Sequence, residues 1–259
     1  MKNLLILLDI AFMVFVGANL YDAKKQTNIL FIGNSYTYRN EMPDIFEHIA
    51  ISMGRQVYVS SATKGKATFR IQSKRSEVFK AIRSKKWDYV IVQGASRDML
   101  ASEEELNDET FPALKKIFKA IRNNRRRTKI LFYMTWGYKD GYKPDGEADS
   151  YEKMSLKVRD GYLELKKKYR FGVVPVGMAW RDSRRKRPDV NLYVKDGAHP
   201  SYKGSYIAAS CFYSAIFNES AIGSTYYGVL GPRISYYLQS VGSRNVLYQR
   251  KKYGLIKEF

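Results

Sequence analysis

The feature that most constrains the fold is an alternation of short apolar runs with longer segments of helical periodicity. The apolar runs read as strands buried on both faces and lie at residues 28–32, 57–59, 87–93, 129–134 and 173–176. Amphipathic helices are predicted where apolar side chains recur every three or four residues, at 42–53, 103–124, 151–169 and after Lys203. Such alternation predicts an α/β fold with three α/β/α layers and a five-stranded, mostly parallel sheet. Pro175 cannot donate to a strand ladder, so the fifth strand is expected at an edge.

The size and charge of the chain narrow its organisation and its partners. The 259 residues fit one domain, which we expect over 23–259, with a less regular tail from about Glu219. The net charge of +20 suggests an anionic partner, such as an acidic polysaccharide or a membrane surface, or simply a solvated basic face. No nucleic-acid partner is expected, because the short basic runs lack interleaved aromatic residues and match no known motif.

The N-terminus resembles a targeting segment. Lys2 precedes an apolar run that ends near Gly17 and Ala18, a pattern typical of secretory signal peptides. Asp9 interrupts the run, which is also short for a membrane span. Residues 1–22 are therefore interpreted as a signal peptide or an uncleaved anchor, or else as part of the folded core. The first two interpretations predict an exported protein, periplasmic or extracellular, with membrane contact only through this segment.

Ser35 follows the first predicted strand in Gly33-Asn34-Ser35. Parallel sheets bind ligands at the carboxyl ends of their strands, so a serine at this point would be presented to a ligand. Backbone N–H groups around it could face a developing oxyanion. The alternative is an ordinary polar turn, because Gly, Asn and Ser are common turn residues.

A serine nucleophile needs a base, and the chain has two histidines. His48 lies beside the apolar face of a predicted helix and is interpreted as structural. His199 lies in Asp196-Gly197-Ala198-His199-Pro200, before the last predicted helix. A carboxylate three residues earlier on the same loop can bond the far ring nitrogen and fix the tautomer. Ser35, Asp196 and His199 thus form a candidate catalytic set.

Gly-Asn-Ser after the first strand, together with Asp-x-x-His-Pro before the last helix, resembles the SGNH (GDSL-like) hydrolases. The resemblance spans residues 28–218 and implies a flavodoxin-like fold, with Ser35 as nucleophile and His199 and Asp196 as its partners. The family's usual Gly-Asp-Ser reads Gly-Asn-Ser here, and position 34 is not a member of the catalytic set.

The resemblance also implies an oxyanion hole built from the N–H groups of Ser35 and Gly65. The family's third block usually supplies an asparagine, whereas this chain reads Gln93-Gly94-Ala95-Ser96, which looks like the turn of the carbohydrate acetylesterase branch. We therefore assign the third donor to the Gln93 amide, with Ser96 as the alternative. Losing one such donor typically costs about 10²–10³-fold in rate.

The predicted substrate-binding residues follow the strands at the same edge: Asn34, Ser96, Trp136 and Tyr138. The segment from Met134 to Gly141, with Tyr193-Val194-Lys195, is similar to SGNH-like proteins of bacteria. Trp136 and Tyr138 are interpreted either as a wall that stacks on sugar rings or as ordinary loop packing.

The resemblance implies ester hydrolysis through an acyl-enzyme on Ser35, most simply of an O-acetyl group on a carbohydrate. The substrate is expected to be a small-molecule or glycan ester that carries acidic groups. No metal or organic cofactor is implied, and the single cysteine, Cys211, excludes a multi-cysteine metal site. Two alternatives stay open: an acyltransferase with the same residues, and a non-catalytic glycan- or surface-binding module. The sequence carries no signal for the oligomeric state.

Overall fold

A computed structural model describes residues 26–256 of the chain. Its sheet has five parallel strands in the order β2-β1-β3-β4-β5. The strands are β1 (Thr27–Gly33), β2 (Val57–Thr63), β3 (Tyr89–Val92), β4 (Lys129–Tyr133) and β5 (Gly172–Val174). The five-stranded parallel sheet and the edge position of β5 confirm the prediction from the sequence.

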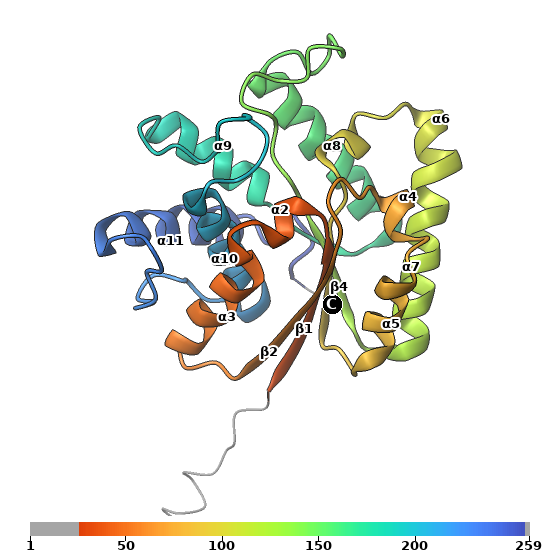
Figure 1. Ribbon diagram of the computed structural model, residues 1–259, viewed down its shortest axis with the longest axis horizontal. Helices are drawn as coiled ribbons and strands as arrows, with labels where there is room; N and C mark the ends of the chain where they lie inside the picture. The colour runs from red at the N-terminus through yellow and green to blue at the C-terminus, as the bar shows by residue number, and fades with distance from the viewer. Residues whose placement is uncertain (1–25, 257–259) are drawn as a thin grey trace, which may run out of the picture.

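Helices cover both faces of the sheet (Figure 1). One layer contains α3 (Met42–Ser52), α9 (Val176–Lys186), α10 (Tyr202–Phe217) and α11 (Pro232–Leu247). The other contains α4 (Phe69–Gln72), α5 (Ser76–Ser84), α7 (Phe111–Asn124) and α8 (Tyr151–Tyr169). A hydrophobic core lies on each face of the sheet, and successive side chains of a strand point to opposite faces. Phe31 packs into the core beside the first helix layer, whereas Leu30 and Ile32 pack into the core beside the second. This confirms the three-layer α/β/α architecture.

Proline explains two departures from the predicted elements. The helix expected over 103–124 is divided into α6 (Glu103–Glu105), a π-helical turn (Leu106–Thr110) and α7. Pro112, in the first turn of α7, has no N–H to donate to the preceding turn, so regular α-helical bonding cannot run through it. The fifth strand was expected to reach Val176, but Pro175 ends it and α9 begins there.

The segment after Glu219 is more regular than predicted, because it contains α11. This helix packs against α10 through small side chains, and Ser214 Oγ donates to Ser243 Oγ over 3.0 Å. At Gly242 an added Cβ would lie 2.9 Å from the Ser210 Cβ, so only glycine allows this approach. Cys211 is buried beside this contact, as expected of a small core residue.

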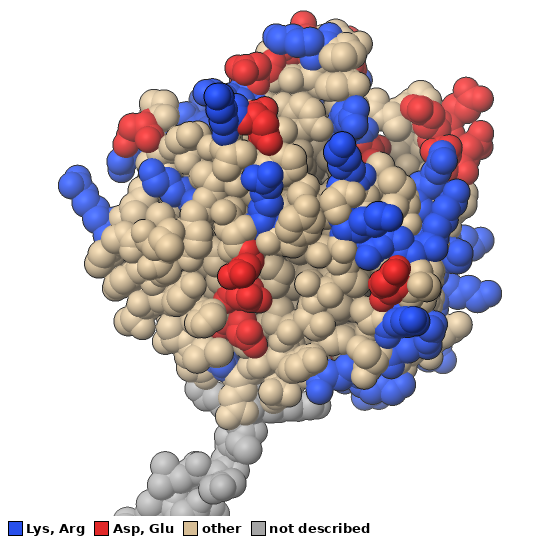
Figure 2. All heavy atoms as spheres, viewed as in Figure 1, with Lys and Arg blue, Asp and Glu red and all other residues tan. Residues whose placement is uncertain are grey.

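The segment 1–22 lies outside the described residues, so its interpretation as a signal peptide or anchor stays a prediction. Among residues 26–256, no helix combines the length and apolar character needed to cross a bilayer. Figure 2 shows Lys and Arg gathered on the side covered by α5 and α7, where the exposed basic residues include Lys80, Arg83, Lys115, Lys116 and Lys119.

Candidate active site

Ser35 stands at the point where β1 gives way to α2 (Ser35–Tyr38). Asn34 caps this helix by accepting from the Tyr36 N–H over 3.0 Å. As the first helical residue, Ser35 has a backbone N–H with no intrahelical acceptor. Gly33 is required before it, because an added Cβ would lie 2.3 Å from Thr37 Oγ1 and 2.5 Å from Gln93 Oε1.

The structure brings Ser35, His199 and Asp196 together in a continuous hydrogen-bonded series. Ser35 Oγ lies 2.9 Å from His199 Nε2. The other ring nitrogen of His199, Nδ1, lies 2.6 Å from Asp196 Oδ2. An Asp carboxylate at Nδ1 favours the tautomer in which Nδ1 carries the proton and Nε2 accepts one. His199 is therefore oriented to accept the hydroxyl proton of Ser35.

Asp196 stays ionised because its turn is built around it. Burial alone would raise the pKa of this carboxyl group, but hydrogen bonds from the N–H groups of His199 and Ala198 and from the His199 ring lower it to about 2. The two backbone donors lie 2.8 and 2.9 Å from Asp196 Oδ1. An ionised carboxylate at this position can stabilise an imidazolium cation on His199.

Asn40 links the loop that follows α2 to the loop that carries His199. Its side-chain amide donates to the Pro200 carbonyl over 3.1 Å and to Ser205 Oγ over 2.9 Å. Asn40 has a φ of 54°, a left-handed conformation that asparagine tolerates better than most residues. This link fixes the position of His199 relative to Ser35.

Of the two interpretations of Trp136, the sugar-stacking wall is wrong, and packing within the protein is the one that agrees with the structure. Its side chain is fully buried and lies parallel to Trp180 of α9, with ring centroids 3.7 Å apart. Its indole N–H donates to the Ala198 carbonyl over 3.0 Å. The ring also packs on Tyr36, which in turn meets the His199 ring edge to face. Trp136 is therefore a positioning residue, which holds the His199 turn through the Ala198 carbonyl and through Tyr36.

We expect Trp136→Phe to lower kcat for an ester substrate about tenfold with little change in KM, because the unsupported Ala198 carbonyl lets the His199 turn shift. The unfilled hydrogen bond should also cost about 1–3 kcal/mol of folding free energy. The measurements are steady-state kinetics and urea unfolding.

Trp87→Phe is the matched control. Trp87 is equally buried and its indole N–H donates to the Ala81 carbonyl over 3.0 Å, but it lies before β3, at the opposite end of the sheet. It should lose stability and retain kcat. An equal loss of kcat in both variants would contradict the positioning role.

Gln93 cannot serve as the predicted oxyanion donor. Its side chain is fully buried, and Oε1 accepts from the Asn34 N–H and from Thr37 Oγ1, each over 2.8 Å. The amide nitrogen donates to the Gly94 carbonyl. Gln93 instead holds together the turns after β1 and β3, and both ends of its amide are occupied. Ser96, the alternative donor and a predicted substrate-binding residue, is also buried, and its hydroxyl donates to the Trp136 carbonyl. It does not line the cavity, so the prediction that it binds substrate is wrong.

Two other predicted site residues, Gly65 and Asn34, lie at the expected edge of the sheet. Gly65 is exposed in the turn after β2, which is tied to β1 by the Lys64 N–H donating to the Gly33 carbonyl over 3.1 Å. Asn34 is buried, and its amide nitrogen donates to the Ala67 carbonyl over 3.0 Å. An ionised aspartate could not make that bond, so asparagine at position 34 joins the turns after β1 and β2.

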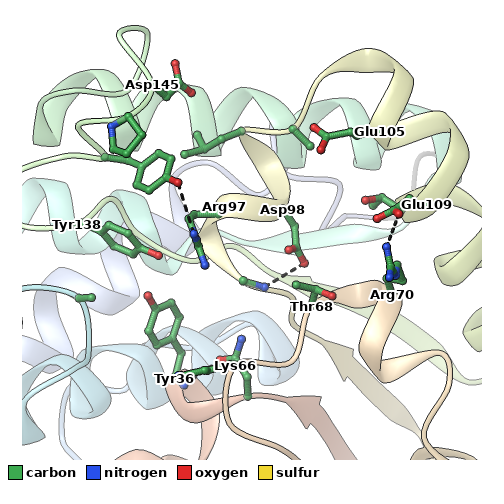
Figure 3. Close-up of a pocket in the computed structure, with 18 of the residues that line it drawn as sticks. Tyr36, Lys66, Thr68, Arg70, Arg97, Asp98, Glu105, Glu109, Tyr138 and Asp145 are labelled. Carbon is green, nitrogen blue, oxygen red and sulfur yellow. Dashed lines mark hydrogen bonds and ion pairs between the residues drawn. The ribbon is translucent and has the colours of Figure 1, made fainter.

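A cavity of about 680 Å³ opens beside Ser35 and His199 at this edge. Tyr138 lines it, as predicted, together with four residues that were not predicted to lie in the site: Tyr36, Lys66, Arg97 and Tyr142. Figure 3 shows the Tyr36 and Tyr138 hydroxyls facing one another across this space. Burial and the neighbouring Tyr138 phenol raise the pKa of Tyr36 well above its usual value, so its hydroxyl stays protonated. Tyr36 and Arg97 follow β1 and β3, so their position in the chain was the available signal.

His48 lies on α3 and takes no part in this site. Its Nδ1 lies 2.7 Å from the Asp44 carbonyl, and its ring stacks on Tyr226. These contacts agree with the structural role predicted for it.

Asp98, at the cavity wall, should make stability depend on pH. Burial raises its pKa to about 6, although the Phe69 and Ala95 N–H groups donate to it. The pKa of Asp98 is higher in the folded than in the unfolded protein, so its protonated form favours folding. This contribution to the free energy of unfolding is complete below about pH 4 and is lost as the pH rises through about 6. Asp98→Asn keeps the acceptor oxygen without the charge. We expect the variant to gain about 3 kcal/mol relative to wild type between pH 4 and pH 7, measured by urea unfolding. Parallel pH profiles would contradict this.

Comparisons with known proteins agree with this architecture. The chain superposes on the crystal structure of a DUF4886 family protein from Bacteroides uniformis with a TM-score of 0.72 at 18% identity, over 86% of this chain and 96% of that one. A protein from Parabacteroides merdae described as a GDSL-like lipase gives 0.56 at 14% identity, over 76% and 98% of the two chains. A lipase/acylhydrolase from Enterococcus faecalis gives 0.54 at 16% identity, over 74% and 96%. No curated protein matches the sequence.

The fold is thus that of the GDSL-like, or SGNH, hydrolases. The chain belongs to the family described as domain of unknown function DUF4886, whose model matches residues 16–228.

Proposed function

We propose that the protein is a serine esterase that hydrolyses its substrate through an acyl-enzyme on Ser35. The observation that carries this proposal is the contact of 2.9 Å between Ser35 Oγ and His199 Nε2, continued to Asp196 by the contact of 2.6 Å at Nδ1. A hydroxyl, an oriented imidazole and an ionised carboxylate in series form the arrangement that activates serine nucleophiles.

In the proposed reaction, His199 Nε2 takes the proton from Ser35 as Oγ attacks the ester carbonyl. Asp196 stabilises the imidazolium that forms, and His199 then returns the proton to the leaving alcohol. Water attacks the acyl-enzyme with His199 again as base, which releases the acid and restores Ser35. The N–H groups of Ser35 and Gly65 are the proposed donors to the oxyanion.

The proposed substrate is an O-acetylated carbohydrate. Support comes from the exposed position of the cavity at the sheet edge and from a volume that suits a sugar-sized ligand. Interpreting residues 1–22 as an export segment adds that the protein would meet such glycans outside the cytoplasm.

The test is acetate release from O-acetylated oligosaccharides by purified protein without residues 1–22, together with labelling by a fluorophosphonate probe. Hydrolysis with a labelled Ser35 is expected. Labelling with transfer of acetyl to an added sugar, and no free acetate, would identify an acyltransferase instead. The absence of both labelling and turnover would favour a non-catalytic binding module.

A further inference from the structure

The cavity beside Ser35 contains a cation, Arg97, that forms no ion pair within the described residues. Arg97, from the 3₁₀ turn Ser96–Met99, projects into the cavity between Tyr138 and Asp98 (Figure 3). Its guanidinium group donates to the Tyr142 hydroxyl over 3.4 Å and lies 5.5 Å from the centre of that ring. Its charge also lowers the pKa of the neighbouring Asp98 carboxyl, but the two side chains form no ion pair within the described residues. A neutral phenol at that distance leaves most of the five guanidinium N–H donors available.

Each carboxylate that lines the same cavity has a hydrogen-bond or ion-pair partner other than Arg97, although the charge of Arg97 also acts on Asp98. Asp98 accepts two backbone N–H groups, Glu105 accepts the Ser102 N–H over 3.0 Å, Glu109 pairs with Arg70, and Asp145 pairs with Lys157 over 3.0 Å. Lys66, on the wall below Arg97, makes no ion pair within residues 26–256. Among the charged side chains of the lining, Arg97 and Lys66 are therefore the ones with N–H donors left for a ligand.

We propose that the cavity selects esters that carry a carboxylate, and that the Arg97 guanidinium binds this carboxylate while Ser35 attacks the ester. This inference rests on the proposed esterase function and adds a substrate class to it. The planar guanidinium matches a carboxylate with two parallel hydrogen bonds, and Lys66 adds a second positive charge. Both side chains are exposed to solvent, so added salt should weaken their attraction for a carboxylate.

The test compares two acetate esters that differ in charge and little in shape, 4-acetoxybenzoate and 4-acetoxybenzamide. The readout is the kcat/KM for 4-acetoxybenzoate divided by the kcat/KM for 4-acetoxybenzamide. Each rate is measured from the absorbance of the released phenol. Because each protein is compared with itself, differences in intrinsic ester reactivity cancel between variants. Arg97→Gln should lower this ratio about ten- to a hundredfold, and Arg97→Lys should lower it less. The ratio for wild type should also fall as salt is added.

Arg233→Gln is the matched control for net charge. Arg233 lies exposed on α11 and does not line the cavity, so its removal should leave the ratio as in wild type. An unchanged ratio in Arg97→Gln, with both esters hydrolysed, would overturn the proposal and leave the esterase function standing.

A binding measurement tests the same site without turnover. In a Ser35→Ala background, calorimetry should show tighter binding of 4-hydroxybenzoate than of 4-hydroxybenzamide, and Arg97→Gln should remove the difference. Loss of the preference supports the anion site even if neither ester is hydrolysed, in which case only the esterase proposal fails. Equal binding of the two compounds by Ser35→Ala would overturn the anion site.

Discussion

Ser35→Ala is expected to reduce kcat for acetyl ester hydrolysis by about 10⁴- to 10⁶-fold and to abolish labelling by a fluorophosphonate. The substitution removes one oxygen, whose hydrogen-bond partner in the structure is His199. Hydrolysis would then require direct attack by water, and the covalent route would be closed. The measurements are initial rates with a chromogenic acetate and intact-protein mass after labelling.

The control for this substitution is Ser52→Ala. Ser52 ends α3, and its hydroxyl donates to the Ile49 carbonyl over 2.8 Å, away from the cavity. It should keep wild-type rates and labelling. Rates and labelling that are the same in Ser35→Ala and wild type would show that Ser35 is not the nucleophile.

Asp196→Asn is expected to lower kcat by about 10⁴-fold without unfolding the turn. The amide oxygen can still accept from the Ala198 and His199 N–H groups, so the backbone keeps its shape. The amide nitrogen would face Nδ1 in place of the carboxylate oxygen and donate to it. His199 would then carry its proton on Nε2, where it cannot accept one from Ser35.

Asp189→Asn separates this effect from a general loss of charge. Asp189 lies just after α9 and pairs with Arg187 on the exposed surface. It should retain wild-type kcat, whereas a small effect of Asp196→Asn would mean that the carboxylate does not set the His199 tautomer.

Much of the fold and of the candidate catalytic set could be predicted from the sequence, because each depends on local pattern. The strands are recognisable as short apolar runs, and Ser35 closely follows one of them. Asp196 and His199 need only a short loop to meet. α11 was missed because its inward-facing side chains are small, such as Gly242 and Ser243, and leave a weak apolar period.

The errors concern side chains whose direction is set by distant partners. Gln93 turns inward because it accepts from Asn34, which lies 59 residues earlier in the chain. Trp136 is buried because Trp180 packs against it from α9, a helix that was not predicted from the sequence apart from Val176, which was assigned to the fifth strand. Spacing along the chain shows which strand end a residue follows. It does not show whether the side chain is buried in the core or faces the cavity.

The proposed catalytic groups are separated very unequally along the chain. Asp196 and His199 are three residues apart, whereas Ser35 and His199 are separated by 164. The acid–base pair can therefore form as soon as its own turn closes, while the nucleophile meets that pair only after α10 docks beside the loop held by Asn40. Because closing so long a loop costs chain entropy before the contact stabilises the fold, we expect this contact to form late in folding. During refolding, reactivity toward a fluorophosphonate would thus mark completion of the whole domain rather than assembly of the sheet.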